Sequence, residues 1–245
     1  MAEMICICGE SGSGKTTSIR NLNPEETFII TTTGKRPGIP GAKKKYRNLN
    51  TAGKNPEELG NFYTTTSVDN VATMLKLINS KMTWIKYVII DDFQYFMAFE
   101  AMDRAKEKGY EKFTEMAQHA YSVLKNAMNL RDDLYIVVST HSENIGDRVN
   151  QYLKIKTLGK MLDSVITLEG LFTYVLFTTI EKDEENKPKY MFKTNSDGTC
   201  TAKSPMGLFD ELLIDNDLNM VISRIKEYNG CLLYTSDAAD DLIGV

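Results

Sequence analysis

The chain has little of several residue types on which particular functions depend. Among its 245 residues are two histidines and four cysteines, and the cysteines Cys6, Cys8, Cys200 and Cys231 form no C-x-x-C pair. Zinc sites and redox motifs need such spacings, so neither is predicted. Cys6 and Cys8 alternate with isoleucines, and we expect both to be reduced thiols in a protein core.

Long apolar runs and a dominant charge sign are also missing. No run approaches the roughly 18 apolar residues that span a bilayer, and the first expected strand begins almost at Met1, so we expect no membrane segment and no signal peptide. We therefore expect a cytoplasmic protein. A net charge of −4 does not suggest wholesale binding of nucleic acid, and 42% hydrophobic with 25% charged residues is typical of soluble globular proteins.

The last residues of the chain have an unusual sequence. Residues 231–241 read Cys-Leu-Leu-Tyr-Thr-Ser-Asp-Ala-Ala-Asp-Asp, which looks like the translation of an adapter oligonucleotide from a sequencing library. We interpret residues 231–245 as adapter read-through and not as a domain. A natural terminus is the alternative. Residues 1–230 are then expected to form one domain.

A phosphate-binding pattern lies near the start of the chain. The residues Gly9-Glu10-Ser11-Gly12-Ser13-Gly14-Lys15-Thr16 match G-x-x-x-x-G-K-[ST] in full. An apolar strand at residues 4–8 precedes it, and residues 17–22 are able to open a helix. Lys15 can reach the β- and γ-phosphates and the Thr16 hydroxyl can coordinate Mg²⁺. We expect ATP and Mg²⁺ as cofactors, bound by Gly9, Glu10, Ser11, Gly12, Ser13, Gly14, Lys15, Thr16 and Thr17.

Apolar periodicity predicts an α/β fold with a mostly parallel central sheet flanked by helices. Core strands are expected at residues 27–32, 87–90 and 134–139, and helices at residues 68–78, 95–106 and 111–130. Residues 34–53 are expected to be a loop. Residues 173–180 and 189–194 are expected to pair as C-terminal antiparallel strands around a charged turn, and residues 208–228 are expected to form a closing helix.

Polar residues end two of the expected core strands. Asp91 is expected to hold Mg²⁺ through bound water, and Asp92 to orient or activate the attacking water. One of the two aspartates capping the next helix is the simpler alternative. Glu10 is a second candidate base, although an exposed carboxylate would look the same in sequence. His141 ends the other strand, where it can sense the γ-phosphate or bond only to nearby backbone.

Several segments together resemble phage-encoded AAA-family ATPases of RecA-like type, some of which are similar to single-strand annealing or recombination ATPases. They are residues 9–16, 91–92, 139–141, 157–160, 168–172 and 202–207. The resemblance implies a RecA-like core, Mg²⁺-dependent ATP hydrolysis and a role in phage DNA recombination or replication in the cytoplasm of an infected bacterium. Single-stranded DNA, further copies of the chain and phage recombination or replication proteins are the implied partners.

Two details qualify this resemblance. RecA-like proteins commonly carry a catalytic glutamate at the end of the second core strand, whereas residues 30–34 here read Ile-Thr-Thr-Thr-Gly. Hydrolysis must then rely on Asp92, Glu10 or a partner's group, and we expect slow intrinsic turnover. Lys160 is a candidate finger toward a neighbouring subunit's nucleotide, or else a solvated lysine.

A basic segment follows the second expected strand. Residues 34–48 carry no acidic residue and contain the DNA-binding candidates Lys35, Arg36, Lys43, Lys44, Lys45, Tyr46 and Arg47. Cations can neutralise phosphates and Tyr46 can stack on a base, which suits single-stranded nucleic acid. A solvated basic loop is the alternative.

Two other function classes stay open. A nucleoside or nucleotide kinase would share the phosphate loop but needs an Arg-rich lid, which the sequence does not show. A nucleotide-dependent scaffold that does not hydrolyse ATP would need no base. A GTPase is disfavoured because no N-K-x-D motif occurs.

Overall fold

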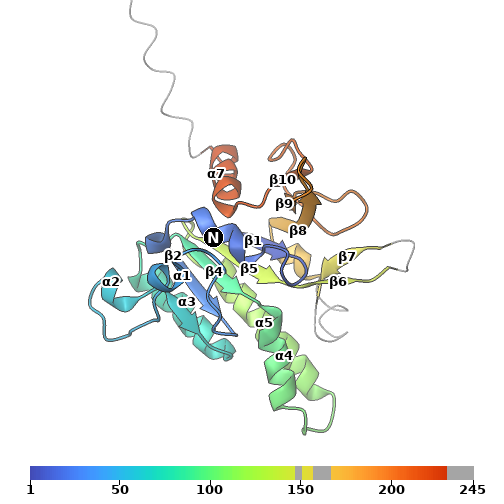
Figure 1. Cartoon of the computed structure of the whole chain (residues 1–245). Helices are drawn as coiled ribbons and strands as arrows, with labels where there is room; N and C mark the ends of the chain where they lie inside the picture. Colours follow the sequence, from blue (N-terminus) through green and yellow to red (C-terminus); the bar gives the residue numbers. More distant parts are fainter. Residues whose placement is uncertain (147–150, 157–166, 231–245) are drawn as a thin grey trace, which may run out of the picture.

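A computed structural model describes residues 1–146, 151–156 and 167–230, and its centre is a large sheet (Figure 1). The strands lie in the order β10-β9-β8-β1-β5-β4-β2-β3, parallel from β8 to β3 and antiparallel at β8-β9-β10. Their bounds are β1 Glu3–Cys8, β2 Thr27–Thr31, β3 Phe62–Thr64, β4 Tyr87–Asp91, β5 Tyr135–Thr140, β8 Tyr174–Lys182, β9 Pro188–Lys193 and β10 Leu213–Asp215. The mostly parallel α/β sheet with C-terminal antiparallel strands is confirmed.

Helices cover both faces of the sheet. In β1, Cys6 and Cys8 pack into one apolar cluster, whereas Ile5 and Ile7 pack into the other, because successive side chains point to opposite faces. The first cluster includes side chains of α3 Val68–Lys81, α4 Gln94–Asp103 and α5 Glu111–Met128, and the second includes those of the 3₁₀ helix η1 Thr16–Asn21 and of α7 Leu218–Tyr228. Figure 1 shows α7 and α3–α5 on opposite sides of the sheet. Both expected core thiols are buried and free.

Two of the expected helices are shorter in the structure than the sequence predicted. The segment after the phosphate loop is only the six-residue 3₁₀ helix η1, not the start of an α-helix. β-branched residues weaken helix formation there, and Pro24 at the start of the next short helix, η2 Pro24–Glu26, disfavours a helical Asn23. The C-terminal helix begins at Leu218 and not at 208, because Asp217 caps it by accepting from the Asn219 amide at 2.9 Å.

Short elements connect the core strands. The stretch expected to be loop, residues 34–53, contains the helix α1 Ala42–Lys45, and a second short helix, α2 Pro56–Leu59, follows it before β3. A small hairpin, β6 Ser142–Asn144 and β7 Leu153–Ile155, follows β5, and a 3₁₀ helix η3 Leu168–Leu171 precedes β8. None of the described helices is long and apolar enough to cross a membrane. Lys160 and the tail at 231–245 lie outside the described residues.

Candidate functional site

The phosphate loop begins where β1 ends, at the carboxyl edge of the parallel strands. Gly12 and Gly14 have φ angles of 81° and 97°, in the left-handed region that side chains rarely adopt. Gly9 is needed for a different reason, since a Cβ there would lie 1.8 Å from Thr178 Oγ1 on β8. Thr178 Oγ1 also lies 2.5 Å from Ser13 Oγ, so a hydrogen bond joins the loop to β8.

Lys15 holds its charge inside this loop. Its ammonium donates to the carbonyl oxygens of Gly9 at 2.9 Å and Glu10 at 2.7 Å, and the residue is only 6% exposed. Burial lowers the pKa of Lys15, and the nearby Asp92 and Asp91 carboxylates act in the opposite direction. The ammonium therefore lies within a loop of the kind whose backbone N–H groups bind phosphate oxygens.

Asp91 lies directly beside the loop. Thr16 Oγ1 donates to its carboxylate, at 3.2 Å from Oδ1 and 3.1 Å from Oδ2, and Ser139 Oγ donates to Oδ1. Burial raises the pKa of Asp91, while the hydrogen bond from Ser139 lowers it. These are hard oxygen ligands, so Thr16 and Asp91 fit Mg²⁺ bound with nucleotide phosphates.

Asp92 adopts an unusual backbone conformation at the same edge. It is one of two described non-glycine residues with positive φ, at 58°, and its amide donates to Ser139 Oγ at 2.9 Å. Its carboxylate Oδ1 lies 3.7 Å from His141 Nε2. Because a left-handed non-glycine residue costs about 1–3 kcal/mol, such residues concentrate at functional sites. Asp92 and His141, both predicted from strand ends, therefore do lie together.

His141 is held so that its ring stays uncharged. Its backbone amide donates to Gln94 Oε1 at 3.3 Å, and its ring lies edge-on to Tyr95. Burial lowers the pKa of His141, and Lys15 lowers it further. At neutral pH the imidazole is therefore a neutral group, able to donate one hydrogen bond.

The remaining predicted loop residues have simpler surroundings. Glu10, Ser11 and Thr17 are exposed. The Glu10 carboxylate raises the pKa of Lys15 less than Asp92 or Asp91 does. Of the two candidate bases, Asp92 lies 3.7 Å from His141, whereas Glu10 is exposed. Sequence reasoning missed Thr178 and Gln94, because a threonine in an expected strand and a glutamine in an expected helix carry no motif.

The basic segment contains one prediction that is wrong. Tyr46 was expected to be available for stacking, but it is 0% exposed and packs in the core cluster that also holds Ile39 and Phe62. It follows α1 in sequence, and the helix turns this ring inward while the lysines face solvent. Base stacking on Tyr46 would require part of the core to open.

The cations of this segment divide into two groups. Arg36 is used internally, since Nε donates to the Tyr46 carbonyl at 2.9 Å and the guanidinium lies over the Phe62 ring at 4.7 Å. The exposed cations are Lys35, Lys43, Lys44, Lys45 and Arg47. Only these five remain candidates for contacts with phosphates.

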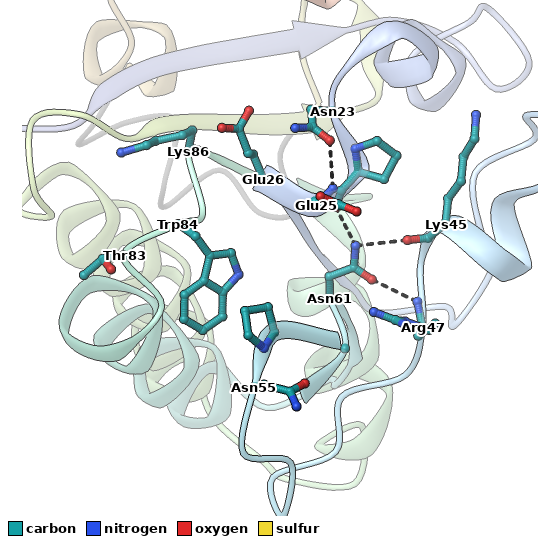
Figure 2. Close-up of a pocket in the computed structure, with 13 residues that line it drawn as sticks. Asn23, Glu25, Glu26, Lys45, Arg47, Asn55, Asn61, Thr83, Trp84 and Lys86 are labelled. Carbon is teal, nitrogen blue, oxygen red and sulfur yellow. Dashed lines mark hydrogen bonds between the residues drawn. The ribbon is translucent and has the colours of Figure 1, made fainter. Parts of the chain in front are cut away.

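A pocket of about 790 Å³ lies at the amino edge of β2, β3 and β4, opposite the phosphate loop. Lys45, Arg47 and Trp84 line it (Figure 2). Asn61 fixes its wall, donating to the carbonyls of Pro24 and Lys45 and accepting from the Arg47 amide at 2.9 Å. Two residues of the exposed basic segment therefore line the same pocket as the half-buried Trp84, the single tryptophan of the chain.

Comparison with known protein families identifies the N-terminal part of the chain. The model of a protein family described as AAA domain matches residues 1–135, more than half of the chain. No curated protein matches the chain. The matched segment contains the phosphate loop, Asp91 and Asp92. On the match and the geometry together, this chain belongs to the AAA domain family of nucleotide-binding P-loop NTPases.

Proposed function

We propose that the chain is a magnesium-dependent ATPase. The observation that carries this proposal is the contact of Thr16 Oγ1 with both oxygens of Asp91, beside the buried ammonium of Lys15. Two oxygen ligands and one cation then border a single glycine-rich loop, which suits a nucleoside triphosphate with its Mg²⁺. Nucleotide binding follows from the family, whereas the choice of ATP and its hydrolysis are our proposal.

The side chains around the loop would divide the work. Lys15 would exchange the Gly9 and Glu10 carbonyls for β- and γ-phosphate oxygens, and Thr16 and Asp91 would hold the metal ion. Mg²⁺, when bound, neutralises phosphate charge. Asp92 would orient the attacking water and accept its proton, and neutral His141 would donate a hydrogen bond to the γ-phosphate. The 3.7 Å between Asp92 and His141 supports their acting on one phosphate.

We also propose that this ATPase is of RecA-like type. The support is strand order, since β5 lies between β1, which leads into the loop, and β4, which ends in Asp91. β2 ends at Thr31 without a carboxylate, so a glutamate is missing where RecA-like proteins commonly carry one. Slow intrinsic turnover, with Asp92 as the base, is the consequence.

A role on single-stranded DNA in phage recombination or replication is the third part of the proposal. Five exposed cations in an acid-free segment support contacts with phosphates. With Tyr46 buried, Trp84 is an aromatic residue that lines the same pocket as Lys45 and Arg47, two of these cations (Figure 2). Further copies of the chain and phage-encoded proteins are proposed partners, within the host cytoplasm.

One turnover assay separates the three function classes. Purified protein is incubated with Mg·ATP, with and without single-stranded DNA, and phosphate release is measured. Turnover that rises with DNA supports the proposal. Phosphate transfer to a nucleoside would instead indicate a kinase, and binding without turnover would indicate a scaffold. The Asp92→Asn variant controls for contaminating ATPases.

Intrinsic fluorescence tests the contact with DNA directly, because Trp84 is the single tryptophan. An oligonucleotide that stacks on Trp84 should quench its emission, and affinity should fall with salt at a log–log slope of about −0.7 per phosphate contact. Replacing Lys43, Lys44 and Lys45 together by Ala should flatten that slope. Binding at wild-type strength and slope by the triple variant would remove the basic segment from the proposal.

A further inference from the structure

We infer that Tyr190 of β9 and Asn216, just after β10, bind the base of the nucleotide, an adenine-type purine. The inference rests on the proposed function, since it assigns the base end of the same ligand. A pocket of about 630 Å³ lies beside the phosphate loop. Gly12, Gly14 and Thr17 form one wall of it, and Tyr190, Asp215 and Asn216 lie on another.

Tyr190 provides the ring. It is 43% exposed, although Phe192, two residues along the same strand face, is fully buried in the cluster that includes Ile19 of η1. Tyr190 therefore lies on the same side of the sheet as the loop and η1. A Cβ added at Gly14 would lie 3.0 Å from Tyr190 Cδ1, so the ring borders the loop backbone itself. An exposed aromatic face at this distance from a phosphate site suits stacking on a base.

Asn216 provides a hydrogen-bonding group with nothing to bond. The residue is 2% exposed, and within the described part of the chain neither its Oδ1 nor its Nδ2 has a hydrogen-bond partner. Its backbone is held, since its amide donates to the Tyr190 carbonyl at 3.2 Å and its carbonyl accepts from Arg20. Buried amides are almost always paired, so this one points to an absent partner.

The position of the amide fits that role. A Cβ at Gly14 would lie 3.2 Å from Asn216 Nδ2, so the side-chain amide lies close to the backbone of the phosphate loop. Asn216 also lines the pocket. Turning the side chain toward the pocket breaks no hydrogen bond, because the described residues provide none. An asparagine amide matches the N6–H and N7 pair of adenine, donor to acceptor and acceptor to donor.

The charges around the pocket favour a neutral ring over a further phosphate. Lys189 is paired with Asp215 at 3.2 Å, and Arg20 is used on the Asn216 carbonyl. The two cations that line this pocket are therefore already engaged, each with a partner from the protein itself. Residues 188–216 also lie outside the matched AAA segment, so this base contact belongs to the chain's own C-terminal strands.

Binding of ATP and of tripolyphosphate, each with Mg²⁺, separates the two ends of the ligand. Calorimetric titration compares the wild type with Tyr190→Ala, using Tyr110→Ala, another exposed tyrosine, as the matched control. We expect Tyr190→Ala to raise the Kd for ATP roughly 5- to 100-fold, as loss of one stacked base does, and to leave tripolyphosphate unchanged. Tyr190→Phe keeps the ring and should bind ATP as the wild type does.

The second arm tests Asn216. Wild-type protein should prefer ATP over ITP, which lacks the N6 amino group, and Asn216→Ala should remove that preference. Unchanged ATP affinity in Tyr190→Ala, or an equal loss for tripolyphosphate, would overturn the inference while leaving the ATPase proposal standing. A wild type that binds neither ATP nor tripolyphosphate would instead overturn the proposed function, and the inference with it.

Discussion

Two neighbouring aspartates at the end of β4 have opposite environments. Asp91 is buried and accepts hydrogen bonds from Thr16 and Ser139, whereas Asp92 is partly exposed in a left-handed conformation beside His141. A buried, well-hydrogen-bonded carboxylate is suited to a fixed ligand, and a more open one to a reacting water. The one-residue change in environment is therefore the physical basis for their different proposed roles.

Replacing each aspartate by asparagine tests that division. Asp91→Asn should weaken Mg²⁺-dependent ATP binding, because it removes the negative charge that attracts the metal ion. Asp92→Asn should leave the Kd for ATP close to that of the wild type and slow hydrolysis roughly 100- to 10,000-fold, the usual range for general acid–base groups. Asparagine also tolerates positive φ, so the fold should be kept. Equal losses of binding in the two variants would contradict the assignment.

Burial of Tyr46 predicts a pH dependence of stability. Burial raises its pKa from 10.0 to about 12, so the native state keeps a proton that the unfolded chain loses. The stability that the wild type gains from keeping the Tyr46 hydroxyl protonated is fully present below pH 10, and it is lost as the pH rises from 10 through 12. Relative to Tyr46→Phe, the wild type should lose up to about 1.4 kcal/mol of unfolding free energy per pH unit in that window.

Urea unfolding of both proteins between pH 8 and pH 11 measures this difference. The variant Tyr110→Phe is the matched control, because Tyr110 is 88% exposed and its side chain is not part of the core. Parallel stability curves for the wild type and Tyr46→Phe would mean that Tyr46 is reached by solvent, as base stacking on it would require.

Helices and strands with a clear apolar periodicity were predictable from the sequence. Short elements, and side chains whose orientation depends on tertiary packing, were not. Continuous apolar runs predicted β1, β2, β4 and β5, and helical spacing predicted α3 and α5. Three-residue strands such as β3 and β10 carry too few residues to show a period. Whether α1 turns Tyr46 inward depends on the apolar cluster around Phe62, and that contact is set by tertiary packing.

The site was predictable to a similar degree. The phosphate loop and the strand-end Asp91, Asp92 and His141 follow from motif and strand position. Thr178 and Asn216 reach the loop from C-terminal strands far along the chain, and only the sheet order brings them there. The residues of the C-terminal strands that border the loop could therefore be identified only from the structure.

A single glycine, Gly60, allows the turn from α2 into β3. Gly60 has a φ of 72°, and a Cβ there would lie 2.3 Å from the Asn48 carbonyl oxygen. Gly60→Ala should therefore lower the unfolding free energy by roughly 2–4 kcal/mol, from backbone strain together with the clash. Gly109→Ala, with a φ of 96° but no atom within 4 Å, should lose only about 1 kcal/mol. Urea unfolding compares the two, and equal losses would contradict the clash.

Across the whole molecule, the parallel sheet has two edges with different surroundings. The carboxyl edge holds the phosphate loop, the paired aspartates and the base pocket, and the amino edge holds Trp84 with the pocket of Figure 2. The basic segment passes between them, since Gly38 lines the loop-side pocket and Lys45 the other. This arrangement lets nucleotide and a strand of DNA be tested as separate ligands.

The affinity of Mg·ATP for the wild type and for Lys15→Ala tests the central claim most directly. Loss of a charged hydrogen bond costs about 1.5–3 kcal/mol, so we expect a Kd roughly 10- to 100-fold higher in Lys15→Ala, at an unchanged melting temperature without ligand. Lys76→Ala, an exposed lysine on α3, is the matched control and should bind as the wild type does. Wild-type affinity in a folded Lys15→Ala protein would contradict the account.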